Sequence, residues 1–242
     1  MWQNPLNAIK DKQFALAEKG EANPYLPVDD EPKLTEEPGS LEHYKAAMLA
    51  DINQLKQLKT LEAKAAAKTT MLKQYMAFVN GYVNAGENYP NSVAVQVAIW
   101  LFDVGDIAAA LGVILPLIKQ AIHHSPHNFD RPLEVFCCDA TYDWAAALYR
   151  DNKTASPYLD TVVAEMEKGR WSLPVAVESK MYAMLAKHKK LAGEYETALA
   201  HCAKAEAVNP VGAGVKKLKE DIETAMRKLA ATSSSSPGQA TA

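Results

Sequence analysis

Apolar residues recur at helical spacing along most of this chain of 242 residues. After residue 67 they recur every three to four positions, and no segment keeps the alternation with period two that a strand requires. The expected helices cover residues 70–85, 91–102, 106–124, 132–150, 157–168, 174–191, 194–208 and 214–231. Prolines at positions 90, 132, 157, 174 and 210 lie at or near their starts, where a missing N–H costs little. The predicted fold class is all-α, with residues 69–230 forming a domain of packed helical hairpins.

A long amphipathic helix is predicted over residues 41–68, with Ser40 as its N-cap after Pro38-Gly39. Its apolar positions follow a near seven-residue repeat and are candidates for self-association: Leu41, Tyr44, Met48, Ile52, Leu55 and Leu58. Asp51 occupies a position of this repeat at which an apolar residue is expected. The repeat lasts fewer heptads than the three or four that indicate a coiled coil. Two interpretations stay open: a coiled coil between copies, or one helix that lies on its own domain.

Both ends of the chain have compositions that oppose a packed core. Residues 1–40 contain four basic and eight acidic side chains, with prolines at 24, 27, 32 and 38. We expect this acidic lead to be largely unstructured, because proline breaks helices and so much charge buries little apolar surface. Residues 231–242, rich in Ser, Ala and Thr, are expected to form a disordered tail.

Two segments of the helical region, 100–111 and 187–199, echo each other. Each runs from a helix to a glycine, an acidic residue, an apolar residue and then Ala-Leu. Glycine ends a helix in the left-handed conformation, and the acid favours the N-terminus of the next helix. In the second copy the residues typical of a tetratricopeptide hairpin are Gly193, Tyr195, Ala198, Leu199, Ala205 and Pro210. The two copies do not form a regular array, so they predict helical-hairpin architecture with tetratricopeptide-like character.

The composition, 48% apolar and 23% charged, is typical of a soluble globular protein. No stretch approaches the ~18 uninterrupted apolar residues of a membrane span, and the first residues do not resemble a secretory signal. Cys137, Cys138 and Cys202 are too few for a disulfide framework and fit a reducing compartment. The sequence therefore predicts an intracellular protein with no membrane partner.

Charge is distributed unevenly behind a net charge of −3. Residues 41–80 carry six basic and three acidic side chains, and residues 180–242 carry ten and six. The candidates for contact with DNA phosphates are Lys56, Lys59, Lys64, Lys68, Lys73, Lys216, Lys217 and Lys219, with Arg227 and Lys228 beside them. On one helix, residues 56–59 and 64–68 would form a stripe. Arginine is scarce, so such contacts would lean towards positioning the DNA backbone. The alternative is that these lysines only solvate helix faces.

Catalytic motifs are missing from the sequence. It contains no phosphate-binding glycine loop, no Gly-x-Ser-x-Gly elbow and no cysteine pair at metal spacing. The histidines 123, 124 and 127 point apart at a helix end. Asp139 and Asp143 lie on one helix and are expected to form its solvent-facing stripe, whereas Asp103 and Asp106 are expected at helix ends. Cys137 and Cys138 are expected in the core. We therefore predict no catalytic residue, metal ligand or cofactor.

Several segments together resemble the small terminase subunit of tailed temperate phages, over about residues 41–230. The most specific is Trp100-Leu-Phe-Asp103-Val-Gly105-Asp106-Ile-Ala-Ala-Ala-Leu111. The others are residues 43–68, 78–81, 192–199 and 211–217. The resemblance implies a role in DNA packaging in the host cytoplasm: binding double-stranded phage DNA at the packaging site, assembly into a homo-oligomeric ring, and delivery of DNA to the large subunit, which holds the ATPase and nuclease. The Ser-rich end departs from the Lys/Arg-rich tail of that family.

Three functions follow as hypotheses. The first is a packaging adaptor that binds DNA and the large subunit. The second is a tetratricopeptide-like scaffold that binds protein only. The third is a metal-dependent endonuclease subunit, in keeping with a label carried by this branch of the family, although the sequence shows no nuclease motif.

Overall fold

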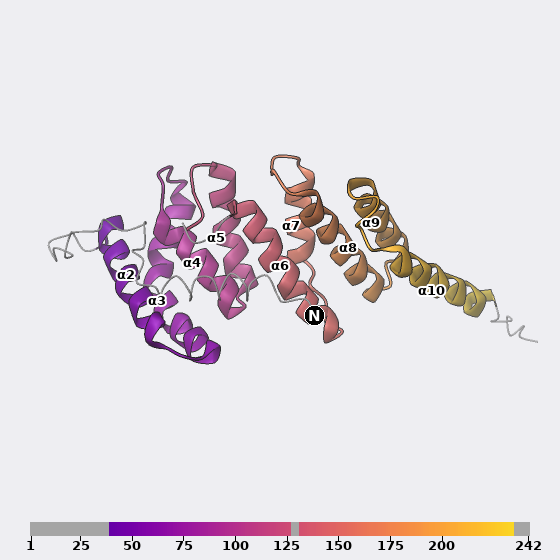
Figure 1. Cartoon of the computed structure of the whole chain (residues 1–242), viewed down its shortest axis with the longest axis horizontal. Helices are drawn as coiled ribbons and strands as arrows, with labels where there is room; N and C mark the ends of the chain where they lie inside the picture. Colours follow the sequence, from indigo (N-terminus) through magenta and orange to yellow (C-terminus); the bar gives the residue numbers. More distant parts are fainter. Residues whose placement is uncertain (1–38, 127–130, 235–242) are drawn as a thin grey trace, which may run out of the picture. The chain divides into compact units, whose positions relative to one another are not determined.

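The computed structural model describes residues 39–126 and 131–234, with side chains up to residue 231. Within these ranges the chain is helical and contains no strand, so the all-α prediction is confirmed (Figure 1). The helices are α2 (Leu41–Gln57), α3 (Leu61–Ala85), α4 (Ser92–Val104), α5 (Ile107–Gln120), α6 (Leu133–Arg150), α7 (Tyr158–Glu167), α8 (Val175–Leu191), α9 (Tyr195–Val208) and α10 (Lys216–Ser234). From α4 onward every predicted helix begins within two residues of the observed start. None of these helices is both long and apolar enough to cross a bilayer.

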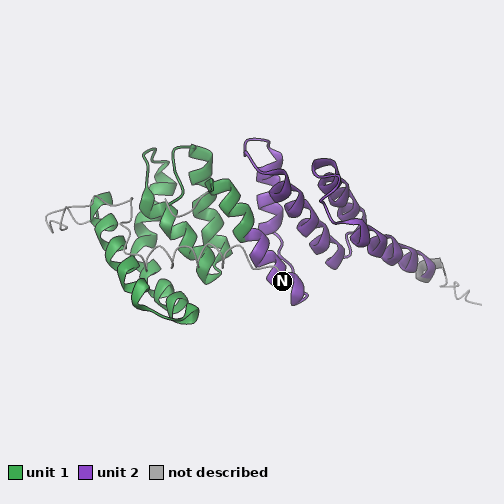
Figure 2. Cartoon of the chain, viewed as in Figure 1, with its two compact units in different colours: residues 1–140 green, residues 141–242 purple. Residues whose placement is uncertain are grey.

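The chain divides into two compact units, residues 1–140 and residues 141–242 (Figure 2). In the first unit, α2, α3, α4 and α5 pack on one another. In the second unit, α8 packs along α9, and α7 and α10 each cover one side of that pair. The two hairpins that the sequence echo predicts are α4–α5 and α8–α9. Tetratricopeptide-like character stays a prediction for the second of them.

The turn between α4 and α5 explains the pattern that residues 100–111 share with residues 187–199. Gly105 adopts the left-handed conformation, with φ of 80°, that lets α4 end abruptly. Asp106 then caps α5, its Oδ1 accepting a hydrogen bond from the Ala109 amide at 3.1 Å. Since only these two residues join the helices, α4 and α5 pack as neighbours. Gly193, with φ of 78°, does the same between α8 and α9.

The single helix predicted over residues 41–68 is wrong, because the chain breaks at residues 58–60. Leu58 is extended and ends α2, and the Thr60 hydroxyl accepts a hydrogen bond from the Ala63 amide at the start of α3. The helix then continues through Thr69 and Thr70, whose hydroxyls bond to the carbonyls four residues earlier. The predicted boundary near residue 70 therefore does not exist, and the real boundary is capped by Thr60.

The apolar positions of α2 face α3 and α4 of the same chain. Met48 and Leu55 are buried, and the Tyr44 ring stacks on the Phe78 ring of α3 at 4.3 Å between centroids. This arrangement is the second of the two interpretations, a helix that lies on its own domain. Leu41, Ile52 and Leu58 are half-buried, so part of the apolar repeat still reaches the surface.

A buried tyrosine of α3 explains why the polar residue Asp51 interrupts the apolar repeat of α2. The Tyr75 side chain of α3 has no exposed surface, and its hydroxyl donates to Asp51 Oδ2 of α2 at 2.6 Å. Gln74 Nε2 donates to the same oxygen at 2.5 Å. The Tyr75 ring meets the Trp100 ring of α4 edge to face at 6.2 Å. Burial, together with the carboxylate partner, raises the pKa of Tyr75, so the hydroxyl stays protonated and donates.

Replacing Tyr75 with Phe is expected to lower the free energy of unfolding by roughly 1–2 kcal/mol, because the ring is kept and one hydrogen bond to a carboxylate is lost. Urea unfolding followed by circular dichroism measures this change. Tyr195→Phe, at a half-buried position in α9, is the matched control. An equal loss in both variants would contradict the importance of the Tyr75–Asp51 contact.

Candidate nucleic-acid interface

Five of the eight lysines predicted to contact DNA are exposed and form no ion pair with a carboxylate among the described residues. They are Lys56, Lys59, Lys73, Lys216 and Lys217. The first lies in the last turn of α2, the second in the connector and the third on α3. Lys216 and Lys217 open α10 in the second unit. Contact of any of them with DNA stays a prediction.

The other three predicted lysines are engaged within the protein. Lys68 Nζ is 2.6 Å from Asp103 Oδ2 of α4, and both side chains are about 15% exposed. Lys64 is buried, and burial, with Lys68 nearby, lowers its pKa. Lys219 pairs with Glu206 of α9 at 2.8 Å, which raises the pKa of Lys219. The predicted stripe of residues 56–68 is therefore wrong, since α2 and α3 are separate helices and Lys64 and Lys68 face inward.

The segment that carries the family resemblance builds the turn from α4 to α5. Trp100 is buried against Tyr75, and Asp103 holds Lys68 of α3. Gly105 ends α4, and Asp106 caps α5. Asp103 and Asp106 lie at helix ends, as predicted. The acidic residues of this segment thus have structural partners that explain their positions.

The lysine surface, as we name it, comprises the exposed side chains Lys56, Lys59 and Lys73 with the neighbouring exposed amides of Asn53, Gln54 and Gln57. Lys73 adjoins Gln74, whose amide donates to Asp51 of α2, and both Lys73 and Gln74 are exposed. Within the described ranges, Lys56 Nζ bonds only to the Asn53 side chain, at 3.2 Å. These amides were not predicted from the sequence. Their signal is the stretch between Asp51 and Glu62, which contains no carboxylate.

Few carboxylates oppose these lysines on α2 and α3. Glu42 pairs with Lys45 at 3.3 Å, and Asp51 accepts from Tyr75 and Gln74. Glu62 lies in the first turn of α3, where the helix dipole stabilises an acidic side chain. The lysine surface is therefore net positive and rich in hydrogen-bond donors, which is the chemistry that phosphate groups require.

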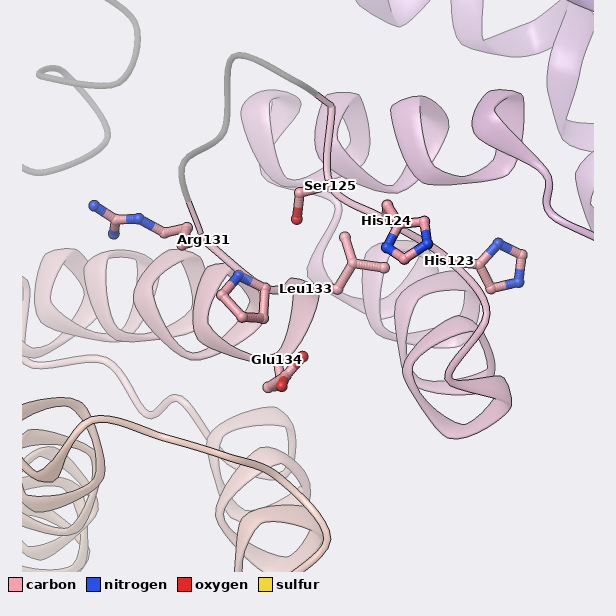
Figure 3. Close-up of a pocket in the computed structure, with 7 residues that line it drawn as sticks. His123, His124, Ser125, Arg131, Leu133 and Glu134 are labelled. Carbon is pink, nitrogen blue, oxygen red and sulfur yellow. The ribbon is translucent and has the colours of Figure 1, made fainter.

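The histidines after α5 line a shallow hollow of about 440 Å³ (Figure 3). His123 Nδ1 accepts from the Asn91 amide at 3.3 Å, and Nε2 lies 2.6 Å from Gln120 Oε1, so both ring nitrogens are used. Burial lowers the pKa of His123. Arg131 points away from the imidazoles in Figure 3, and His127 lies outside the described residues. In the described ranges, no three histidine, cysteine or acidic side chains gather as a metal site would need.

The two aspartates of α6, Asp139 and Asp143, are both at least half-buried. Asp139 is buried and pairs with Arg131, so its predicted place on a solvent-facing stripe is wrong. Asp143, on the same helix, is half-buried. The reason is that residues 135–141 are all buried, so this part of α6 has no solvent-facing side. Cys137 and Cys138 are fully buried, which confirms their predicted place in the core.

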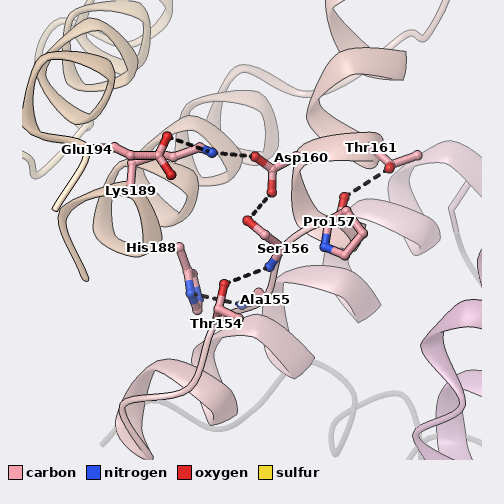
Figure 4. A network of polar contacts seen from close by, with 9 residues as sticks. All are labelled: Thr154, Ala155, Ser156, Pro157, Asp160, Thr161, His188, Lys189 and Glu194. Atoms are coloured by element: carbon pink, nitrogen blue, oxygen red, sulfur yellow. Dashed lines mark hydrogen bonds and ion pairs between the residues drawn. The ribbon is translucent and has the colours of Figure 1, made fainter. Parts of the chain in front are cut away.

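A second polar cluster ties α7, α8 and the start of α9 together in the second unit (Figure 4). Lys189 Nζ lies 2.8 Å from Asp160 Oδ1 and 3.1 Å from Glu194 Oε2. The bond to Asp160 raises the pKa of Lys189. This cluster fixes where α9 leaves α8, and its single cation is paired with two carboxylates, so it offers no free positive charge to a phosphate.

Buried His188 lies beside this cluster. Its Nδ1 accepts from the Ala155 amide at 3.2 Å, and its Nε2 is 3.0 Å from the Ala145 carbonyl oxygen. The ring is therefore the neutral tautomer with its proton on Nε2. Desolvation lowers the pKa of His188, although its bond to Ala145 acts in the opposite direction.

Comparison with known proteins identifies relatives. The family described as phage small terminase subunit matches residues 45–174. The "Terminase, endonuclease subunit" of Escherichia phage P2 is 26% identical over 182 residues, which cover 74% of this chain and 72% of that protein. The "Probable terminase, endonuclease subunit" of Haemophilus phage HP1 is 26% identical over 141 residues, 58% of this chain and 50% of that protein. No solved structure matches.

Replacing Lys68 with Ala is expected to lower the free energy of unfolding by roughly 2 kcal/mol, because it leaves the partly buried Asp103 without its cation. Lys73→Ala, on the exposed side of the same helix, is the control and should change stability by less than about 0.5 kcal/mol. Urea unfolding measures both. Equal stability of the two variants would show that Lys68 is not a structural residue.

Stability of the protein is expected to fall as the pH drops below about 6.5, the ordinary pKa of histidine. His188, His123 and His201 all have lowered pKa values in the folded chain, so the unfolded chain binds more protons in this range. Stability is fully present above the unfolded pKa and is lost as the pH falls towards the folded pKa values. Urea unfolding at a series of pH values measures it, and His188→Gln should reduce the slope. An unchanged slope would contradict the assignment to His188.

Proposed function

Because this chain belongs to the phage small terminase subunit family, we propose that it is a packaging adaptor that binds double-stranded phage DNA through the lysine surface. Membership of the family gives the chain a role in phage DNA packaging. In the proposed function, the chain acts in the host cytoplasm, assembles into a homo-oligomeric ring and delivers DNA to the large terminase subunit, which carries the ATPase and nuclease.

The observation that carries this proposal is the separation of the lysines on α2 and α3 into two groups. Lys64 and Lys68 are taken into the protein, whereas Lys56, Lys59 and Lys73 extend outward without carboxylate partners among the described residues. Lysine binds phosphate as a compact point charge, and phosphates carry no sequence information. Binding through this surface would therefore follow the DNA backbone and weaken steeply with salt. Lys216 and Lys217 are a second candidate surface, in the other unit.

Self-association is part of the proposal, and the half-buried residues of the α2 repeat are its candidates. Leu41, Ile52 and Leu58 retain exposed surface, whereas Met48 and Leu55 are already buried within the chain. We therefore propose that copies of the chain associate through a small contact that these three residues form while α2 stays packed on its own unit. A continuous coiled-coil seam along α2 would need Met48 and Leu55, which are already buried.

Two alternatives have less support. A scaffold that binds protein only would not need the cationic, carboxylate-poor side of the α2–α3 pair. The names of the two phage relatives describe an endonuclease subunit, but in this chain Asp103 and Asp139 serve as ion-pair partners, and Asp106 caps a helix. We therefore propose DNA binding, with cleavage by the large subunit.

Replacing Lys56, Lys59 and Lys73 together with Gln is expected to weaken binding of a short mixed-sequence DNA duplex by roughly tenfold or more. Each lost phosphate contact should also reduce the slope of log affinity against log salt by about 1. Fluorescence anisotropy over a range of salt concentrations measures both quantities.

The matched control replaces Lys153, Lys168 and Lys204 with Gln. These exposed lysines pair with acidic side chains in the second unit, and their loss changes the net charge by the same amount. If both triple variants bind DNA like the parent protein, the lysine surface is not the interface. If both weaken equally, only net charge matters, and the proposed surface is wrong.

A further inference from the structure

The sequence contains an acidic segment shortly before α2. Residues 21–37 carry six carboxylates and a single lysine, Lys33. They join the described part of the protein at Gly39, directly before Ser40 caps α2. The most acidic segment of the chain is therefore tethered to the helix that carries Lys56. We propose that residues 21–37 lie on the lysine surface of the same chain and compete with DNA phosphates for it, an inference that rests on the proposed function.

Charge is the first argument for this occupant. The lysine surface offers Lys56, Lys59 and Lys73 with no carboxylate of the described chain paired to them. Asp29, Asp30 and Glu31 form a run of three acids, and Glu36 and Glu37 form a second run. Two short runs of carboxylates separated by four residues present negative charge at intervals, as successive phosphates do. Such exposed contacts are individually weak and screened by salt.

Tethering is the second argument. α2 has 17 residues and is therefore roughly 25 Å long. Asp29, Asp30 and Glu31 lie nine to eleven residues before Ser40, a stretch that can extend roughly 30–40 Å, so this run can reach the far end of α2. Glu36 and Glu37, three or four residues before Ser40, can extend only roughly 10–14 Å and reach no further than the middle of α2. Tethering makes the effective concentration of the first run at the lysine surface of the order of millimolar.

The consequence is a threshold for DNA binding. A tethered competitor lowers every DNA affinity by the same factor. The dissociation constants of weak, non-specific complexes then exceed the working concentration, so these complexes do not form. DNA that binds more tightly still displaces the acidic segment. The segment would thus reduce binding to unrelated DNA without any base-reading residue.

Cross-linking tests the contact in the full-length protein without DNA. A water-soluble carbodiimide joins a carboxylate to a lysine amine only where the two already touch. We expect peptides with cross-links from residues 29–37 to Lys56, Lys59 or Lys73, lost at high salt. A mixture of ¹⁵N-labelled and unlabelled protein shows whether both ends belong to one chain. Cross-links confined to Lys216 and Lys217, cross-links only between chains, or none at all would overturn the proposal.

DNA binding tests the competition. The variant D29N/D30N/E31Q should bind a short duplex roughly fivefold or more tightly than the parent, measured by fluorescence anisotropy at low salt. The control E196Q/E220Q/E223Q removes three exposed carboxylates of the second unit and should change affinity by less than about twofold. Equal gains in both variants, or none in the first, would overturn the competition. If no variant binds DNA, the proposed function fails, and the cross-links still decide whether the acidic segment occupies the surface.

Discussion

The hydrogen bond from the buried Tyr75 hydroxyl to Asp51 determines how the first unit is arranged. A hydroxyl in an apolar core needs an acceptor, and here the acceptor is a carboxylate on the neighbouring helix. α2 therefore has to lie with Asp51 facing inward, against α3, and the Tyr75 ring then meets Trp100 of α4. Three helices are fixed by one side chain. Because Asp51 faces inward, Asn53, Gln54, Lys56 and Gln57 are left on the outer side of α2.

The break at residues 58–60 has an equally direct effect on charge. If α2 and α3 were one helix, its lysines would lie along a single rod exposed to solvent. Turning the chain back at Thr60 brings α3 against α4, and Lys64 and Lys68 become internal. Asp103 neutralises Lys68 there, so part of the positive charge of this segment stabilises the fold. The remaining lysines form a smaller surface than the sequence suggested.

Most of the helical framework could be predicted from the sequence, because its boundaries are set by local chemistry. Gly105 and Gly193 end helices, Asp106 begins one, and the prolines mark further starts. The break at Thr60 also has a local signal, a threonine cap followed by an acidic residue, but the apolar repeat that runs across it hides that signal. The burial of Lys64 and Asp139 could not be predicted, since each depends on which side of a helix meets its neighbour. The same holds for the lysine surface, whose extent depends on tertiary ion pairs with residues far away in the sequence.

The segment on which the sequence resemblance to the family depends most, residues 100–111, has a structural role. Trp100, Asp103, Gly105 and Asp106 all form contacts that build the α4–α5 turn or hold α3 against it. Such a segment identifies the fold and says little about which DNA is bound. In the proposed function, the exposed cations of the lysine surface contact phosphates, which carry no sequence information. Selection of a packaging site by this surface would then have to come from DNA shape, from the joint action of several copies, or from the exposed amides of Asn53, Gln54 and Gln57, since an amide can bond to base edges.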